Sequence, residues 1–297
     1  MGAFSRIFNS DLITGYNYDE IEGIEGTRLR TQAKLLYNFD MPVLREIFNT
    51  KRNCVILDVG CNEGDAALER LHGFEIAQYI GIDRSSVAIE RAQTKYGDDF
   101  TKFYQIDVTS AKFDIQLGGL LSREHIDKVD VILVSMVLLH LEEPDSVLRA
   151  LYSYLKPGGT IFVRDIDDRD NVAEPDSGNT FKRGYKIVEE CQNSGNRTVG
   201  RRIGGWLIDA GYKNVKCVRR GLTSLGMSNE EKQALFDTYF GFFTPDAEAA
   251  VASDPFNERK LANLGWCHYN IPRIHDLFFT PGFTFTLGFI TYVASKG

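Results

Sequence analysis

The chain has 297 residues, and its 43% hydrophobic and 25% charged content is ordinary for a globular protein with one large domain or two small ones. Its net charge of −7 disfavours a non-specific nucleic-acid binder, because such a protein needs a basic surface. The longest apolar run, residues 131–141, is too short to cross a bilayer, so no membrane association is expected.

The order of the predicted elements indicates the fold class. Residues 1–53 are polar and mixed, and we expect an N-terminal helical cap whose last helix begins at Pro42, since proline suits a first helical turn. Strands and helices then alternate as far as residue 223, which predicts a mainly parallel sheet covered on both faces. The predicted strands are 54–59, 77–83, 102–107, 129–135, 160–165 and 215–222, and the predicted helices are 63–71, 85–96, 122–126, 145–155 and 199–210.

Two stretches interrupt this alternation. Residues 167–196 are polar, with a predicted helix at 181–192. Residues 224–281 are acidic overall but carry ten aromatic residues, a content that argues against disorder. An alternating, β-branched and aromatic final strand follows at 283–293. We expect a core of residues 54–223 and 282–297, with residues 224–281 as a helical insertion that forms a lid or a dimerisation arm.

The cysteines bear on the cellular compartment. The chain has five of them, without a C-x-x-C pair, and an odd, scattered set is typical of reduced buried thiols. Residues 1–9 lack the charged-then-apolar pattern of a signal peptide. We therefore expect a cytoplasmic protein.

The segment from Val55 to Gly64 is the most informative part of the chain. A short apolar strand ends in an acidic residue, a glycine-bearing turn and a helix, which is the front half of a nucleotide-binding βαβ unit. The pattern Asp58-x-Gly60-x-Asn62-x-Gly64 fits the dehydrogenase fingerprint G-x-G-x-x-G badly. A Rossmann dehydrogenase is therefore disfavoured.

Further polar positions follow the next strands. Asp83 ends the second strand, where a carboxylate accepts the ribose hydroxyls of an adenosine; the alternative is that it caps the next helix. Asp107 and Val108 follow the third strand. A Lys-Pro-Gly-Gly turn at 156–159 leads from a helix into the fifth strand, with proline as a helix stop and glycine for positive φ.

The glycine turn, Asp83, Asp107 and the 156–159 turn, in this order and spacing, resemble the motifs of class I S-adenosylmethionine (SAM) dependent methyltransferases. The resemblance covers about residues 50–222 and the last strand. It implies an α/β, Rossmann-like, doubly wound and mainly parallel seven-stranded sheet with an antiparallel last strand. It also implies an enzyme that uses SAM as its methyl donor.

The resemblance assigns a role to each matching residue. Asn62 replaces the usual middle glycine; asparagine tolerates left-handed backbone, and its amide can also bond the SAM carboxylate. The other expected roles are Asp58 at the amino acid end of SAM, Gly60 and Gly64 for close backbone approach, Asp83 on the ribose, Arg84 along the adenine, Asp107 and Val108 at the adenine edge, and Ser135 facing the methionine moiety.

The acceptor is expected at the carboxyl ends of the strands, where open α/β sheets bind ligands. His140 is the candidate base, since histidine has a suitable pKa, and the alternative is that it only positions the strand exit. Arg164 and Asp167 are candidate acceptor ligands, although Arg164 also suits a surface ion pair. Aspartates 165, 167 and 168 offer oxygen ligands, but a charged loop is the simpler explanation, and no metal site is expected.

These features favour a SAM-dependent methyltransferase that acts on a nitrogen or oxygen of a small molecule, as a monomer or homodimer. One alternative is an RNA methyltransferase, because the Gly-Cys-Asn-x-Gly turn is similar to that of RNA 5′-phosphate methyltransferases. Nucleic acid is disfavoured as a partner, because residues 1–53 balance basic against acidic residues and the insertion is acidic. The other alternative is a non-catalytic subunit that retains the SAM-binding fold.

Overall fold

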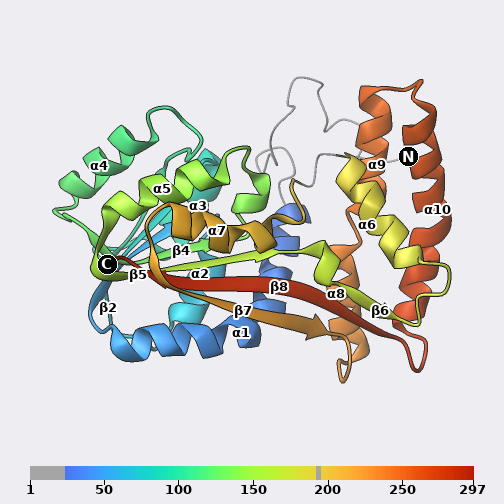
Figure 1. Ribbon diagram of the computed structural model, residues 1–297, viewed down its shortest axis with the longest axis horizontal. Coiled ribbons are helices and arrows are strands. Elements are labelled where there is room, and N and C mark those ends of the chain that lie inside the picture. The colour runs from blue at the N-terminus through green and yellow to red at the C-terminus, as the bar shows by residue number, and fades with distance from the viewer. Residues whose placement is uncertain (1–23, 192–194) are drawn as a thin grey trace.

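The structure is a computed structural model, and it describes residues 24–191 and 195–297. Within these residues the strands form one eight-stranded sheet in the order β3-β2-β1-β4-β5-β8-β6, and β7 also pairs with β8 (Figure 1). The strands are β1 (Cys54–Val59), β2 (Ile76–Asp83), β3 (Thr101–Gln105), β4 (Val129–Ser135), β5 (Leu155–Ile166), β6 (Val172–Glu174), β7 (Lys213–Thr223) and β8 (Thr284–Ser295).

The first five strands form the parallel part of the sheet. β1 lies between β2 and β4, β3 flanks β2, and β5 flanks β4, all in parallel register. Ile56 and Leu57 of β1 and Ile132 and Val134 of β4 are fully buried, as expected for central strands covered on both faces. The carboxyl ends of five neighbouring strands therefore lie side by side. The α/β class with a mainly parallel sheet and an antiparallel last strand is confirmed.

The last strand, β8, organises the other half of the sheet. It runs antiparallel to β5, β6 and β7. Thr286 pairs with Val172 of β6 on one side and with Thr223 of β7 on the other, while β5 pairs with the later residues of β8. The expected count of seven strands was wrong by one. The beginning of β8 extends past the end of β5, and the three residues of β6 satisfy backbone groups there that β5 does not reach.

One long helix, α1 (Ile24–Thr50), precedes the sheet. The expectation of several helical segments, the last beginning at Pro42, was wrong, because Pro42 lies inside this helix. Leu36 before the proline and Leu44, Ile47 and Phe48 after it are all buried. Packing on both sides of Pro42 stabilises a continuous helix despite the lost backbone hydrogen bond.

Helices cover both faces of the sheet. In the view of Figure 1, α4, α5 and α7 lie above the sheet and α1 lies below it. The short helix expected at 122–126 is instead the longer α4, which begins at Phe113. The covering helices are α2 (Asp65–Leu71), α3 (Ser86–Tyr96), α4 (Phe113–Arg123), α5 (Pro144–Tyr154) and α7 (Ile203–Asp209).

A helical bundle stands beyond the beginning of β8, at the right of Figure 1. It combines α6 (Thr180–Cys191) with three helices of the insertion, α8 (Asn229–Tyr239), α9 (Phe243–Ser253) and α10 (Glu258–Phe278). Phe240, Phe243 and Phe278 are fully buried and share one hydrophobic core with the sheet. These aromatic residues are thus core residues. No described helix combines the length and apolarity that a bilayer crossing demands.

Candidate functional site

The register of the sheet brings the predicted cofactor residues together. Val59 pairs with Ile82 on one side and with Val134 on the other. The next residues along these three strands are Gly60, Asp83 and Ser135, so they emerge at the same level of the sheet. Asp107 and Val108 follow the end of β3, which pairs with β2 at this same end.

The turn after β1 needs unusual backbone conformations. Gly60 and Gly64 have φ of 70° and 81°, and Asn62 also adopts the left-handed conformation, with φ of 50°. The amide of Gly60 donates to the carbonyl of Ile82 at 2.8 Å, which fastens the turn to β2. A Cβ at Gly60 would lie 2.4 Å from Cγ2 of Val137, so only glycine leaves this backbone in place.

Asp83 joins the turn to the start of α3. Its Oδ2 accepts from the amide of Asn62 at 3.0 Å, and its Oδ1 accepts from the amide of Ser85 at 2.9 Å. The side chain that caps α3 belongs to Ser85, which accepts from the amide of Ala88. Asp83 is therefore not the helix cap that was weighed as its alternative role. Burial raises the pKa of its carboxyl, while the hydrogen bonds from the two amides oppose the rise.

Asp58 lies beneath the turn and is 5% exposed. The hydroxyl of Tyr79 donates to its Oδ2 at 2.6 Å. Burial raises the pKa of Asp58 to about 7; the Tyr79 hydrogen bond and the charge of Arg70 oppose this rise, and the charge of Asp83 adds to it. A carboxyl that titrates near neutrality thus stands under the expected cofactor site.

The remaining cofactor candidates lie at the same strand ends. Arg84 is exposed, and its carbonyl accepts from Nε2 of Gln105. Oδ1 of Asp107 accepts from both the amide and the hydroxyl of Thr109, at 2.8 and 2.7 Å, which closes a tight turn. Val108 packs against the core. Their contacts with a cofactor stay predictions.

Glu63 in the glycine turn was not among the predicted site residues. It is 8% exposed, and its two carboxylate oxygens accept from Arg30 of α1 at 3.3 Å and from Arg91 of α3 at 3.2 Å. These ion pairs hold the turn between two helices. No local pattern indicated this role, because both partners come from distant parts of the chain.

His140 ends a short 3-10 turn, η3 (Leu138–His140), that follows β4. The amide of Leu139 donates to Oδ2 of Asp165 at 3.2 Å, and the carbonyl of Leu139 accepts from the amide of Asn196 at 2.6 Å. The turn is therefore held between the end of β5 and the segment that begins at residue 195. These bonds place the backbone of His140 at the carboxyl ends of β4 and β5.

Arg164 has a partner inside the protein. It is 2% exposed, and its Nη1 donates to Oδ2 of Asp40 at 2.6 Å. The same oxygen lies 3.2 Å from Nε of Arg70. Because Asp40 already balances its charge in the interior, Arg164 is not carried further as an acceptor ligand.

Asp167 is likewise engaged within the chain. It is fully buried, and its Oδ1 accepts from Nη2 of Arg201 at 2.7 Å and from the amide of Arg169 at 3.2 Å. Its expected role as an acceptor ligand is not carried further either. No group of three or more His, Cys, Asp or Glu side chains in residues 24–191 and 195–297 is arranged to hold a metal ion.

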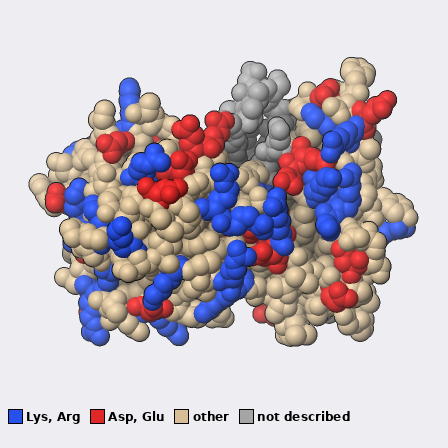
Figure 2. Space-filling view, in the orientation of Figure 1, with Lys and Arg blue, Asp and Glu red and all other residues tan. Residues whose placement is uncertain are grey.

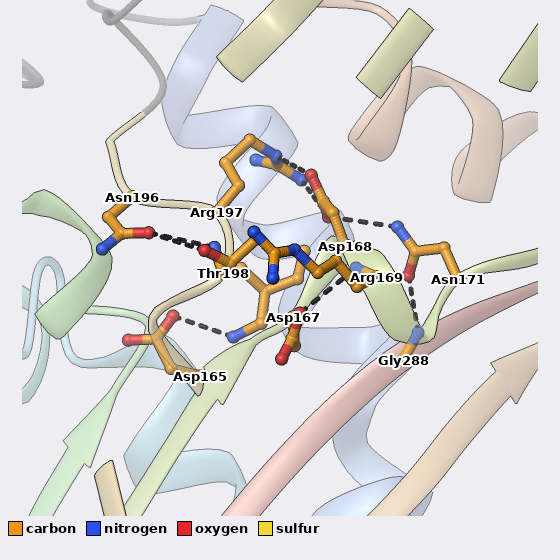
Figure 3. A network of polar contacts seen from close by, with 10 residues as sticks. Asp165, Asp167, Asp168, Arg169, Asn171, Asn196, Arg197, Thr198 and Gly288 are labelled. Carbon is orange, nitrogen blue, oxygen red and sulfur yellow. Dashed lines mark hydrogen bonds and ion pairs between the residues drawn. The ribbon is translucent and has the colours of Figure 1, made fainter. Parts of the chain in front are cut away.

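A second buried ion pair, Asp168 with Arg197, lies beside this loop (Figure 3). Nε and Nη2 of Arg197 both donate to the Asp168 carboxylate, and Nδ2 of Asn171 donates to the same group at 3.0 Å. Oδ1 of Asn171 in turn accepts from the amide of Gly288 at 2.8 Å. The network fixes the 168–171 loop and Arg197 against β8. Arg197 was not among the predicted site residues.

Comparison with known proteins adds three findings. A family model described as a methyltransferase domain matches residues 50–220. Phosphoethanolamine N-methyltransferase 3 of Arabidopsis thaliana is 24% identical over 63% of this chain and 36% of its own length. The U6 snRNA methylphosphate capping enzyme Amus of Drosophila melanogaster is 26% identical over 63% of this chain and 62% of its own length. The chain thus spans less than two thirds of either relative.

Among solved structures, the YcgJ protein of Bacillus subtilis is similar to this chain, with a TM-score of 0.52 and 13% identity. The match covers 87% of this chain and 98% of YcgJ. At this level of identity the likeness concerns the fold alone.

Proposed function

Because the chain belongs to the class I SAM-dependent methyltransferase superfamily, we propose that it transfers the methyl group of SAM to a nitrogen or oxygen atom of a small-molecule acceptor. The observation that carries this proposal is the meeting of the glycine turn with Asp83 and Ser135 at one level of the sheet. The Arabidopsis relative is named as an N-methyltransferase of phosphoethanolamine, which supports the proposed class of acceptor.

The residues at the strand ends fit the cofactor. Because Gly60 has no Cβ, the turn can pack closely against Val137, and the carboxylate of Asp83, which accepts from the amide of Asn62 in the same turn, would accept the ribose hydroxyls. Asp58, in its ionised form, would balance the positive charge of the methionine amino group. When bound, SAM supplies an electrophilic methyl group, and the protein's task is to align the acceptor and exclude water.

His140 is the proposed general base. It stands at the carboxyl ends of β4 and β5, on a turn fixed by Asp165 and Asn196. In the proposed reaction, its imidazole takes the proton from the acceptor nitrogen or oxygen during attack. We expect His140→Ala to lower kcat by about 10²–10⁴-fold with SAM affinity unchanged. His125→Ala, an exposed histidine in a turn after α4, is the control and should leave kcat unchanged.

Titration calorimetry tests the cofactor proposal directly. SAM or S-adenosylhomocysteine should bind the wild-type protein, and NAD should not. Asp83→Ala should weaken SAM binding by roughly 1–3 kcal/mol, the range for hydrogen bonds to a charged group. The matched control is Asp98→Ala, because Asp98 also accepts two backbone amides but precedes β3 at the opposite end of the sheet. A wild-type protein that does not bind SAM would overturn the proposal.

An RNA acceptor is the second candidate. The Drosophila relative is named as an RNA capping enzyme, which favours this candidate, and Lys and Arg side chains gather near the middle of one face (Figure 2). Exposed basic residues on β7 and just before α7 include Arg201, Arg202, Arg219 and Arg220. Arg219, however, is paired with Asp170, and Arg201 with Asp167. We therefore expect negligible binding of bulk tRNA and 5′-phosphorylated RNA in a filter assay at physiological salt, whereas tight, salt-sensitive binding would favour the RNA acceptor.

A further inference from the structure

Three hydroxyl groups in the interior lack a hydrogen-bond partner within the described part of the chain. They belong to Tyr185, Thr238 and Tyr239. Tyr185 is 9% exposed and Tyr239 is 2% exposed, so water does not satisfy these groups from the surface. Native interiors rarely leave polar groups unpaired, because each has given up its bonds to water. Such groups therefore call for an explanation, and a bound polar ligand is one.

The two tyrosines approach one another from different elements. Tyr185 of α6 packs its ring on Phe240 and Phe243, with centroids 5.8 and 5.5 Å away. Tyr239, at the end of α8, packs on Phe289 of β8 at 6.1 Å, and the guanidinium of Arg164 lies over the ring of Phe289. One ring thus lies within the helical bundle and the other between the bundle and β8, and Tyr239 acts electrostatically on the Tyr185 hydroxyl.

The positive charge of Arg197 acts on the hydroxyls of both Tyr185 and Tyr239, and the two hydroxyls also interact electrostatically with each other. Asp168 occupies Nε and Nη2 of Arg197, so Nη1 is the guanidinium nitrogen that does not bond this carboxylate. The guanidinium also lies over the ring of Phe242, 5.0 Å from its centroid. Asn171 faces the Tyr185 hydroxyl and Gln32 faces the Tyr239 hydroxyl, in neither case with a hydrogen bond of ordinary geometry. The region thus offers two O–H donors and one side of a guanidinium.

The surrounding charges differ at the two hydroxyls. Tyr185 is within reach of both the Asp168 carboxylate and the Arg197 guanidinium, whereas the charges around Tyr239 are positive. Burial raises the pKa of Tyr239 to about 12, while the charges of Arg164, Arg28 and Arg197 and the side chain of Gln32 oppose the rise. The phenol therefore stays protonated, and so remains a hydrogen-bond donor, at physiological pH. Donors in a positive field bind oxygen anions, and hydrogen bonds to a charged group are stronger than neutral ones.

We propose that Tyr185, Tyr239 and Nη1 of Arg197 form a subsite that holds an anionic group, a phosphate or a carboxylate, of the methyl acceptor. This inference rests on the proposed methyl transfer and adds the chemical class of the substrate. The amide of Asn196, next to Arg197, donates to the carbonyl of Leu139, next to His140. This backbone bond ties the segment that carries Arg197 to the turn that carries the proposed base.

The test is calorimetric titration with inorganic phosphate and, separately, with acetate, at constant ionic strength and without SAM. The double variant Tyr185→Phe/Tyr239→Phe removes the two donors and keeps the ring volumes. Tyr212→Phe is the matched control, since its buried hydroxyl donates to the carbonyl of Leu148 at 3.0 Å, away from Arg197. We expect saturable anion binding in the wild type and in the control, and at least tenfold weaker binding in the double variant.

The two anions distinguish the source of the charge. Tighter binding of phosphate indicates an acceptor with a phosphate group, and equal or tighter binding of acetate indicates a carboxylate. A wild-type protein without saturable binding of either anion, or a double variant that binds both as the wild type does, would overturn the proposal.

Thermal denaturation guards against a folding artefact. The double variant should be as stable as the wild type in the absence of anion, because no hydrogen bond is lost. Neither measurement involves SAM or turnover, so failure of the subsite leaves the proposed methyl transfer standing. Failure of SAM binding in its own assay would instead remove the proposed function and leave the anion result intact.

Discussion

Asp58 is a carboxyl group held away from water beneath the glycine turn. Its pKa of about 7, raised by burial, is above the value of about 4 that the unfolded chain gives it. Between these two values the folded protein keeps a proton that the unfolded chain has released. The free energy of unfolding must therefore fall as the pH rises through this window.

This leads to a prediction for Asp58→Asn. An amide does not titrate, so the wild type should lose about 2 kcal/mol of stability relative to the variant between pH 5 and pH 8. Urea denaturation at several pH values measures the difference. Comparing the two proteins cancels the contribution of Asp165, whose pKa burial also raises to about 7. Parallel stability curves for the two proteins would show that Asp58 titrates normally.

A second prediction at the scale of single residues concerns the effect of Gly60→Ala on stability and SAM binding. Gly60→Ala forces an alanine into φ of 70° and brings its Cβ against Val137, so it should cost more than about 1 kcal/mol in stability and weaken SAM binding. Gly73→Ala is the control, because Gly73 has φ of 91° but no neighbouring atom within 4 Å of the methyl group that alanine would add. Adding Val137→Ala should restore part of the loss. No restoration would mean that backbone strain alone causes the effect.

Among the elements, α1 is tied to the sheet by a buried carboxylate. Asp40 of α1 meets Arg70 of α2 and Arg164 of β5 in the interior. Asp40→Asn would leave two buried guanidinium groups without a counter-charge, which should cost about 3–5 kcal/mol. Glu46→Gln, on the same helix, removes an exposed pair with Lys216 and should cost less than about 1 kcal/mol. Chemical denaturation of both variants makes the comparison, and equal losses would contradict it.

The elements also show what the sequence could and could not predict. β1 and β4 match their predicted bounds because central parallel strands are continuous apolar runs. The beginning of α4 was missed; its Leu117, Leu120 and Leu121 are buried, but Gly118 and Gly119 interrupt the helical signal. β6 has three residues, too few for a pattern.

The residues of the candidate site likewise include some that the sequence could predict and some that it could not. The glycine turn and Asp83 were visible because one local motif and one strand end define them. The interior position of Arg164 was not visible, since its partner Asp40 lies 124 residues earlier in the chain. Tyr185, Arg197 and Tyr239 come from three separate segments, and only the packing of the helical bundle on β5 and β8 brings them together.

At the scale of the whole molecule, residues 224–281 pack against the sheet as a helical insertion. The hypothesis of a lid lined by aromatic residues must account for the burial of Phe240, Phe243 and Phe278 in the common core. Removing the insertion would therefore expose core as well as open a site. The lid and the dimer arm both remain proposals, and both require an insertion packed firmly on the sheet.

Two phenylalanines of the insertion test that packing. Phe240→Ala should cost about 3–5 kcal/mol, because a fully buried ring is replaced by a cavity. Phe256→Ala, at a ring that is 93% exposed, should leave stability almost unchanged. Sedimentation of the same two proteins reports on the arm: a dimeric wild type that becomes monomeric in Phe256→Ala would favour the arm, and an unchanged mass would favour the lid. A small effect of Phe240→Ala would contradict the shared core.

The central place of β8 has a consequence for synthesis on the ribosome. It is the last described strand to be translated, yet β5, β6 and β7 all pair with it. Thr160 of β5 pairs with Ser295 of β8, so this edge of β5 stays unpaired until Ser295 has been translated. A nascent chain that has made β5 and β7 therefore presents open strand edges and unfilled apolar surface, features that favour association with other chains. We expect a ribosome-stalled chain ending before Thr284 to be held by chaperones, and one extended past Ser295 to be released from them.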